Sequence, residues 1–161
     1  MIFTTIGNIM SKLFMKQCFF VIQIYDSIIK KIKIYFYRAK GVKIGKNFKF
    51  SNDSYIDLHR PGYIEIGDNV QITRWAMILC YDSSKDKYPF NYLLNKDPYG
   101  KVKIGNNVYL GAHSIVMPGV TIGDNVIIAA NSVVTHDISS NSIAAGAPAK
   151  IINTFDFKET V

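Results

Sequence analysis

Every sixth residue is aliphatic over a long stretch towards the C-terminal end of the sequence, from Ile104 to Val134. A period of six matches neither the 3.6-residue turn of an α-helix nor the two-residue alternation of an ordinary strand. A short fixed period is typical of solenoids, in which each unit stacks on its neighbour and the inward side chains form one continuous core. The residues that keep this period are Ile104, Leu110, Val116, Ile122, Ile128 and Val134.

Small residues and residues that tolerate positive φ recur between the aliphatic positions. Gly or Ala often follows the aliphatic residue directly, and Asn, Asp or Gly often stands three places after it. Each six-residue unit is therefore predicted to be a short strand followed by a tight corner, and three units close one triangular coil. The predicted corner residues are Asn107, Gly119, Asn125, Asn131 and Asp137.

The same phase continues upstream, which brings the total to twelve units, or four coils of three. Its members there are Ile44, Phe50, Ile56, Ile66, Ile72 and Ile78. A short insertion separates Ile56 from Ile66, and a much longer one separates Ile78 from Ile104. Both insertions follow the third unit of a coil, so we expect them to leave from one edge of the prism. Loops on a rigid scaffold are where binding sites usually form.

Residues 1–40 follow a helical period instead, because apolar side chains recur at spacings of three and four opposite a group of lysines. Polar residues such as Lys16, Gln23 and Asp26 interrupt the apolar run, so we expect an amphipathic helix and not a membrane span. Such a helix would cap the end of the coil, which we favour because solenoid ends need covering, or make peripheral contact with a membrane. The apolar residues of this pattern are Val21, Ile24, Tyr25, Ile28, Ile32 and Tyr35.

Composition supports one folded domain with an appendage. The 161 residues are 48% hydrophobic, which is enough for one core. Cys18 and Cys80 lie far apart and no signal peptide precedes them, so a cytoplasmic location is expected, with contact at the inner face of the membrane as an open alternative. We predict a helical segment over residues 1–40, an all-β parallel β-helix of about four coils over 41–152 with a loop at 79–101, and a tail over 153–161.

The net charge of +7 does not by itself indicate nucleic-acid binding. The lysines are not interleaved with aromatic residues along the repeats, as single-strand binding would require. Much of the excess lies in residues 30–49, where it would suit a membrane surface or an anionic cofactor equally well. We therefore expect no nucleic-acid partner.

Three runs resemble a known family: 103–108 (KIGNNV), 111–123 (GAHSIVMPGVTIG) and 144–150 (AAGAPAK). They are similar to the hexapeptide-repeat acetyltransferases, especially the bacterial enzymes that O-acetylate sugars of capsule, exopolysaccharide or lipopolysaccharide. The resemblance implies a left-handed coil, an exception to the right-handed crossover rule. It also implies a homotrimer that binds acetyl-CoA between neighbouring subunits and transfers the acetyl group to a carbohydrate hydroxyl.

By the same resemblance, the CoA groove would be lined by small residues, because an extended pantetheine arm must approach the backbone closely. His136 stands where the family usually has a lysine near the CoA phosphates, and Lys150 stands near the nucleotide end. A largely neutral imidazole attracts phosphate less than an ammonium group does, so weaker CoA binding is expected. The full predicted cofactor set is Tyr109, Ala112, Ala130, Thr135, His136 and Lys150.

The catalytic residue departs from the family pattern. Related enzymes have a histidine early in the long insertion as general base, whereas this chain has Tyr81 there and no histidine within residues 79–101. Loss of a general base costs roughly 10²- to 10⁴-fold in rate. Three hypotheses remain: Tyr81 with Asp82 has taken over, a histidine elsewhere serves, or the protein is a trimeric binding or scaffold protein without efficient transfer.

Two histidines outside the long insertion are candidates for the base. His113 occupies a corner position, which is its favoured role, while His59 lies in the short insertion and could reach the site. The three histidines of the chain lie at different phases of the repeat, so no zinc site of the kind found in γ-class carbonic anhydrases is predicted. Asn52 and Asp53, together with Asp57, offer hydrogen bonds suited to a sugar acceptor.

Overall fold

The computed structural model of the chain describes residues 2–87 and 97–156. It divides into two compact units, Met1–Phe36 and Tyr37–Val161, each of which is described by itself. Helix α1 (Ile2–Lys40) fills the first unit and ends in the second, which matches the helix predicted over residues 1–40. Within the described residues, no helical stretch combines the length and hydropathy that crossing a membrane requires.

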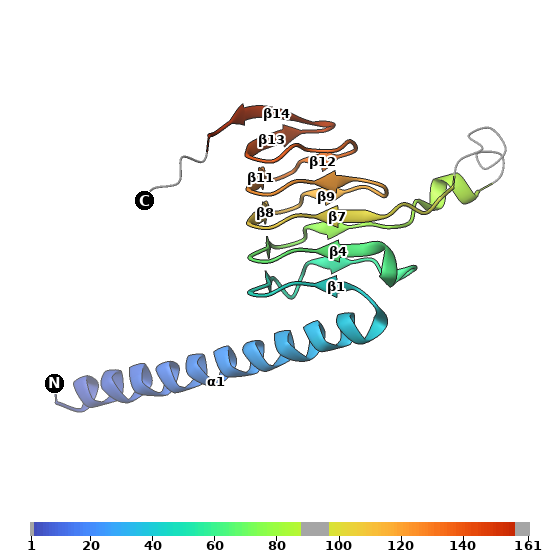
Figure 1. Cartoon of the computed structure of the whole chain (residues 1–161). Coiled ribbons are helices and arrows are strands. Elements are labelled where there is room, and N and C mark those ends of the chain that lie inside the picture. Colours follow the sequence, from blue (N-terminus) through green and yellow to red (C-terminus); the bar gives the residue numbers. More distant parts are fainter. Residues whose placement is uncertain (1, 88–96, 157–161) are drawn as a thin grey trace. The chain divides into compact units, whose positions relative to one another are not determined.

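The second unit is a three-sided parallel β-helix, as the period of six predicts (Figure 1). The first face consists of β1 (Lys43–Ile44), β4 (Ile64–Ile66), β7 (Val102–Ile104) and β10 (Thr121–Ile122). The second face consists of β2 (Lys49–Phe50), β5 (Gln71–Ile72), β8 (Val108–Leu110), β11 (Val126–Ile128), β13 (Ser142–Gly146) and β14 (Ala149–Thr154). The third face consists of β3 (Tyr55–Ile56), β6 (Met77–Ile78), β9 (Ile115–Val116) and β12 (Val133–Val134).

The period-six residues form the core of this unit. Eleven of the twelve are no more than 6% exposed, and Ile44 is half-buried in the first coil. Each pairs in register with its counterpart one coil away, as Ile66 pairs with Ile104 and Ile72 with Leu110. The four predicted coils are therefore confirmed. A second inward position, two residues before the first in each unit, also contributes buried side chains: Val70, Val102, Val108, Val120 and Val126.

The corner between the first and second faces, here called the amide edge, is built from asparagines. Five of them adopt positive φ of 52–58°. The side-chain amides of the first four donate to the carboxamide oxygen one coil further on, at 2.8–3.0 Å, so the five corners are joined in a continuous ladder. Of the predicted corner residues only Asp137 lacks a positive φ, and its carboxylate accepts the backbone N–H of Thr121 at 2.7 Å. The ladder residues are Asn47, Asn69, Asn107, Asn125 and Asn141.

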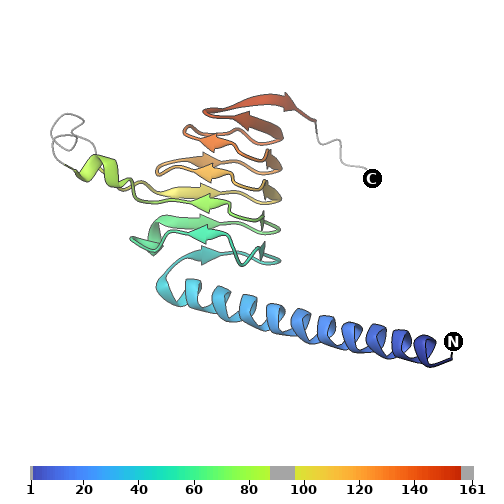
Figure 2. The ribbon, with the colours of Figure 1, turned by 180° about the vertical axis from the view of Figure 1, so that it is seen from behind.

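Both insertions leave from the corner between the third and first faces, as predicted; we call this corner the insertion edge. The short insertion follows β3 and contains the 3-10 helix η1 (Pro61–Tyr63). The long insertion follows β6 and contains η2 (Ser83–Asp86), which projects away from the stacked coils (Figure 2). Residues 88–96 of the predicted loop at 79–101 lie outside the described residues.

The stack continues past the fourth coil, which the period-six pattern did not indicate. Ile138 bridges Ile122 and Ala144 pairs with Ile128, so this last turn is two residues shorter than the uninterrupted coil before it. Strand β14 then folds back antiparallel to β13 and ends at Thr154, two residues beyond the predicted boundary at 152. Residues 157–161 of the predicted tail lie outside the described residues.

Substitution of Asn125 tests what holds the amide edge. Asn125→Ala removes two ladder hydrogen bonds. It also leaves an alanine at φ 56°, a backbone conformation that is unfavourable for a residue with a Cβ. We expect the free energy of unfolding to fall by about 2–3 kcal/mol. Asn125→Gly also removes the bonds but tolerates the backbone, so a loss of about 1 kcal/mol is expected. Denaturant titration at matched protein concentration measures both, and equal losses would contradict a role for the positive φ.

Candidate functional site

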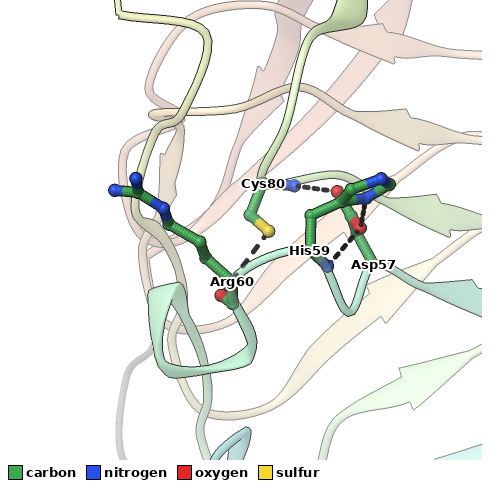
Figure 3. Close-up of polar contacts among 4 residues, drawn as sticks. All are labelled: Asp57, His59, Arg60 and Cys80. Atoms are coloured by element: carbon green, nitrogen blue, oxygen red, sulfur yellow. Dashed lines mark hydrogen bonds and ion pairs between the residues drawn. The ribbon is translucent and has the colours of Figure 1, made fainter.

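A buried carboxylate organises the insertion edge. Asp57 directly follows β3 and its side chain is 2% exposed. One carboxylate oxygen accepts the backbone N–H of His59 at 2.9 Å and lies 2.6 Å from Nδ1 of the same histidine. The other oxygen accepts the backbone N–H of Cys80 at 3.1 Å (Figure 3). Asp57 therefore ties the short insertion to the start of the long one.

The hydrogen bonds of Asp57 fix its charge. Burial by itself would raise the pKa of Asp57, but the hydrogen bonds from His59 and from Cys80 together hold that pKa below its usual value. The carboxylate is thus ionised at neutral pH and can only accept, so Nδ1 of His59 carries the hydrogen. In the neutral form of this imidazole, Nε2 would have the lone pair, on a side chain that is 55% exposed. An oriented imidazole of this kind can take a proton from a hydroxyl group.

A row of stacked side chains extends from His59 along the insertion edge. The Tyr81 ring lies 4.6 Å from the His59 ring at 28°, and the Tyr99 ring lies 4.9 Å from Tyr81. The guanidinium of Arg60 lies 3.9 Å from the centre of the Tyr99 ring. Tyr63 contacts Tyr99 edge-on at 6.5 Å. We call the set His59, Tyr81, Tyr99, Arg60 and Tyr63 the aromatic row.

Cys80 lies beneath this row and has little nucleophilic character. Its side chain is fully buried, and its thiol donates to the carbonyl oxygen of Arg60 at 3.6 Å (Figure 3). Burial raises the pKa of the thiol to about 11, so the thiolate is scarce at neutral pH. A covalent acyl-cysteine intermediate at this position therefore has no support in the geometry.

Tyr81 and Asp82 were predicted to act together, and the structure gives them different surroundings. Asp82 is the N-cap of η2: its carboxylate accepts the backbone N–H of Ser84 at 3.1 Å and the Ser84 hydroxyl at 2.6 Å. Lys85 lies 3.8 Å from the same carboxylate. Tyr81 instead packs between His59 and Tyr99. The residue that the structure brings next to Tyr81 is therefore the alternative base considered above, His59.

The corner between the second and third faces, here called the alanine edge, carries Ala112 and Ala130. A Cβ added to Gly111 would lie 2.5 Å from the backbone nitrogen of Ala130, which shows how closely successive coils approach here. His113 is a corner residue with φ 58°, as predicted, and it remains exposed. Its ring lies 4.7 Å from the ring of Trp75 in the preceding coil. Sequence reasoning missed Trp75, although a tryptophan at a corner position is an unusual choice.

The remaining predicted residues lie at the two edges and on the second face. Asn52 and Asp53 lie at the alanine edge of the first coil, between β2 and β3. Thr135 and His136 follow β12 at the insertion edge, with Thr135 Oγ1 and His136 Nδ1 2.8 Å apart. Tyr109 projects from the second face, where it is 40% exposed, and Lys150 lies on β14. The predicted cofactor residues are therefore spread over both edges, which flank the third face, and over the second face.

Asp57, Arg60, Tyr63 and Tyr99 were not identified as a set from the sequence. The sequence pattern indicates Asp57 only as one of several polar residues suited to a sugar. The sequence signal that could have identified Asp57 is its position, immediately after the inward residue Ile56 and two residues before His59.

The three histidines do not converge: His59 and His113 lie at different edges, and His136 lies three coils from His59. Among the described residues, no cluster of three potential ligands could hold a metal ion.

Comparison with known proteins identifies the family. The family model for bacterial transferase hexapeptide repeats (six repeats) matches residues 101–136. Protein CapG of Staphylococcus aureus is 43% identical over 128 residues, which cover 76% of this chain and 72% of that protein. Galactoside O-acetyltransferase of Escherichia coli K12 is 36% identical over 130 residues, which cover 78% of this chain and 60% of that enzyme.

Solved structures agree with these relatives. A maltose O-acetyltransferase from Clostridium difficile 630 superimposes with a TM-score of 0.58 at 34% identity, over 72% of this chain and 60% of that one. A galactoside acetyltransferase in complex with coenzyme A superimposes with a TM-score of 0.53 at 31% identity, over 72% of this chain and 56% of that one. The chain thus spans somewhat more than half of these enzymes. With a relative 43% identical of which it spans 72%, the chain belongs to the hexapeptide-repeat family of CoA-dependent O-acetyltransferases, which fold as left-handed parallel β-helices.

Proposed function

We propose that this protein transfers the acetyl group of acetyl-CoA to a hydroxyl group of a saccharide belonging to a bacterial surface polysaccharide or its precursor. The relatives named for galactoside and maltose acetylation support a sugar acceptor. The resemblance of residues 103–108, 111–123 and 144–150 to enzymes that O-acetylate surface-polysaccharide sugars favours a surface polysaccharide. The observation that carries the proposal is the exposed imidazole of His59, held by the buried carboxylate of Asp57 on the edge where both insertions leave the β-helix.

In this reaction the acceptor oxygen attacks the carbonyl carbon of the thioester while an imidazole takes the hydroxyl proton. The tetrahedral intermediate then collapses, the C–S bond breaks, and the CoA sulfur leaves with a proton. Exposed imidazoles lie at the insertion edge, where His59 and His136 are three coils apart, and at the alanine edge, where His113 lies beside Trp75. His136 belongs to the predicted cofactor residues, which leaves His59 and His113 as the candidate bases. His113 adjoins Ala112 of the predicted CoA groove, and His59 is oriented by Asp57. An imidazole is a far better base at neutral pH than the phenol of Tyr81, whose ordinary pKa is near 10.

The prediction is that an imidazole, and not Tyr81, takes the proton. His59→Asn and His113→Asn, measured separately, should include one variant that loses about 10²- to 10⁴-fold in kcat with CoA affinity nearly unchanged. If the base is His59, Asp57→Asn should also lower kcat, because the ring loses its orienting carboxylate. Tyr81→Phe keeps the stacked ring and should retain most of the activity.

Steady-state acetylation of a panel of sugars, followed as free CoA release, measures these rates. A Tyr81→Phe loss as large as that of either histidine variant would restore the hypothesis of a phenolate base. Wild-type protein that binds CoA but acetylates no sugar or nucleotide sugar would favour the scaffold alternative.

The third face gives a reason for assembly into a trimer, which is the second part of the proposal. Its outward side chains form an apolar column, in register through successive coils. The outward column of the first face is instead polar: Lys43, Glu65, Lys103 and Thr121. Three-fold assembly joins unlike surfaces of neighbours. Burial of the third face can therefore set the insertion edge of one copy opposite the alanine edge of the next. The apolar column is Tyr55, Met77, Ile115 and Val133.

Charge placed in the apolar column should dissociate the trimer. Ile115→Lys introduces an unpaired ammonium group into the proposed interface, and we expect a monomer at micromolar concentration and loss of transfer activity. Thr121→Lys is the matched control, because it adds the same charge in the first face. Sedimentation equilibrium measures the mass against the 18.2 kDa chain. A monomeric wild-type protein would rule out both the trimer and the shared site.

Helix α1 supports peripheral contact with an anionic membrane at the cytoplasmic face, which is the third part of the proposal. From Met15 onward most of its apolar side chains are exposed, among them Val21 at 63%, Ile28 at 50% and Ile32 at 61%. At 100° per residue these lie on one side of the helix, Lys16, Lys30 and Lys33 lie on the other, and Lys31 lies at the boundary between the two. A helix of this kind places its apolar face among acyl chains and its lysines at the headgroups.

Binding to vesicles tests this contact. The protein should sediment with vesicles of phosphatidylglycerol and phosphatidylcholine at 0.1 M salt, and much less with phosphatidylcholine alone. Lys31→Glu with Lys33→Glu should weaken binding at least tenfold, whereas Lys103→Glu on the β-helix should not. Equal binding to neutral and anionic vesicles, or retention after a high-salt and alkaline wash, would contradict the peripheral mode.

A further inference from the structure

The aromatic row holds a cation at the end opposite His59. The Arg60 guanidinium lies over the Tyr99 ring at 3.9 Å and 5.4 Å from the centre of the Tyr63 ring. One of its nitrogens donates to the Tyr63 hydroxyl at 3.1 Å. Lys101 Nζ lies 5.9 Å from the Tyr63 ring, so a second cation adjoins the same end of the row. Figure 3 shows the Arg60 guanidinium and the His59 imidazole pointing away from each other on either side of Cys80.

This guanidinium is held in place without an ion pair. Arg60 is exposed, and among the described residues no carboxylate lies within 4.0 Å of Arg60 or Lys101. Stacking on a tyrosine reduces the side-chain entropy that binding would otherwise cost. A guanidinium has five N–H donors, of which the Tyr63 bond uses one. The remaining donors suit a planar carboxylate or a phosphate, which arginine binds through paired hydrogen bonds.

We propose that the aromatic row is the acceptor subsite and that Arg60 selects a saccharide carrying an anionic group, either a carboxylate or a phosphate. This inference rests on the proposed transferase function. The sugar lies along the edges of the stacked Tyr81 and Tyr99 rings, and its reacting hydroxyl lies towards His59. The anionic group meets Arg60, and Lys101 adds positive charge. The row connects these ends through three contacts of 3.9–4.9 Å, a span suited to a charged monosaccharide.

The same cations could instead serve the phosphates of CoA. The predicted CoA residues, however, are Ala112 and Ala130 at the alanine edge and His136 and Lys150 near the far end of the stack. Arg60 belongs to the short insertion of the first coil. A substitution of Arg60 should therefore change the affinity for the acceptor if Arg60 binds the sugar, and the affinity for CoA if it binds the cofactor.

Acceptor kinetics with matched sugars test the inference. Galactose, galacturonate and galactose 6-phosphate share a ring but differ in charge, and the two anions distinguish a carboxylate from a phosphate source. We expect kcat/KM to be at least tenfold higher for one or both anions than for galactose. Arg60→Gln should raise KM for the preferred anion at least tenfold, leave kcat within about threefold, and leave the Kd of CoA unchanged. Arg60→Lys should restore part of the affinity because it keeps the charge.

Lys103→Gln is the matched control, because it removes a cation from the first face, outside the aromatic row, and should change none of these constants. Thermal unfolding of each variant identifies any that fail to fold. If Arg60→Gln fails to fold, the KM of Arg60→Lys compared with that of the wild-type protein tests the inference. Unchanged KM for both anions in Arg60→Gln and Arg60→Lys would overturn the inference while leaving the transferase function intact. A loss of CoA affinity in Arg60→Gln would overturn it in favour of a cofactor role.

Direct binding separates this inference from the proposed function. Isothermal titration of wild-type protein with galacturonate or galactose 6-phosphate should show binding that weakens in Arg60→Gln, and it requires no turnover. Binding of this kind without acetyl transfer to any sugar would support the anion subsite while the transferase function failed. Absence of both anion binding and anion preference in an active enzyme would overturn the inference alone.

Discussion

The stacking of each corner on the corner of the next coil is the constraint on which the rest of the molecule depends. A coil of three very short strands has too few backbone hydrogen bonds within itself to persist, so its donors and acceptors are satisfied by the coils on either side. At the amide edge the side chains repeat this pattern, because each carboxamide bonds to the next, as Asn107 does to Asn125 at 2.9 Å. Positive φ at every one of these residues brings the chain round the corner. The aliphatic column inside fills the space that the corners define.

Stacking also determines where chemistry can develop. Parallel strands lie about 4.8 Å apart, so residues at equivalent positions of successive coils form columns along each edge. Trp75 and His113 are far apart in the sequence, yet their rings are 4.7 Å apart because both occupy the same corner of adjacent coils. Asp57 and Cys80 meet in the same way at the insertion edge. A regular core thus leaves the insertions free to vary while fixing the points from which they start.

Much of the fold was predictable because the repeat is explicit in the sequence. The twelve inward residues, the four coils and the shared edge of both insertions follow from one period, and the structure confirms them. The fifth, incomplete coil was missed because the spacing shortens by two residues after Val134 and because Ala144 is too small to stand out in an aliphatic pattern. Antiparallel β14 has no repeat signal at all, since its pairing depends on the turn that precedes it.

The site was less predictable than the fold, because insertions obey no period. Comparison with the family pattern directed attention to Tyr81 as a replaced base, since a histidine is expected at that position. Its ring instead stacks on His59, which comes from the other insertion, one coil earlier in the chain. A tyrosine at this position supplies a flat apolar ring face for the imidazole of His59 and also contacts Tyr99. A histidine would offer a smaller and more polar ring for both contacts. The substitution of Tyr81 therefore has a packing reason that is independent of proton transfer. The absence of the histidine that the family resemblance leads one to expect does not by itself imply a loss of activity. Asp57 orients the imidazole of His59 directly beside Tyr81.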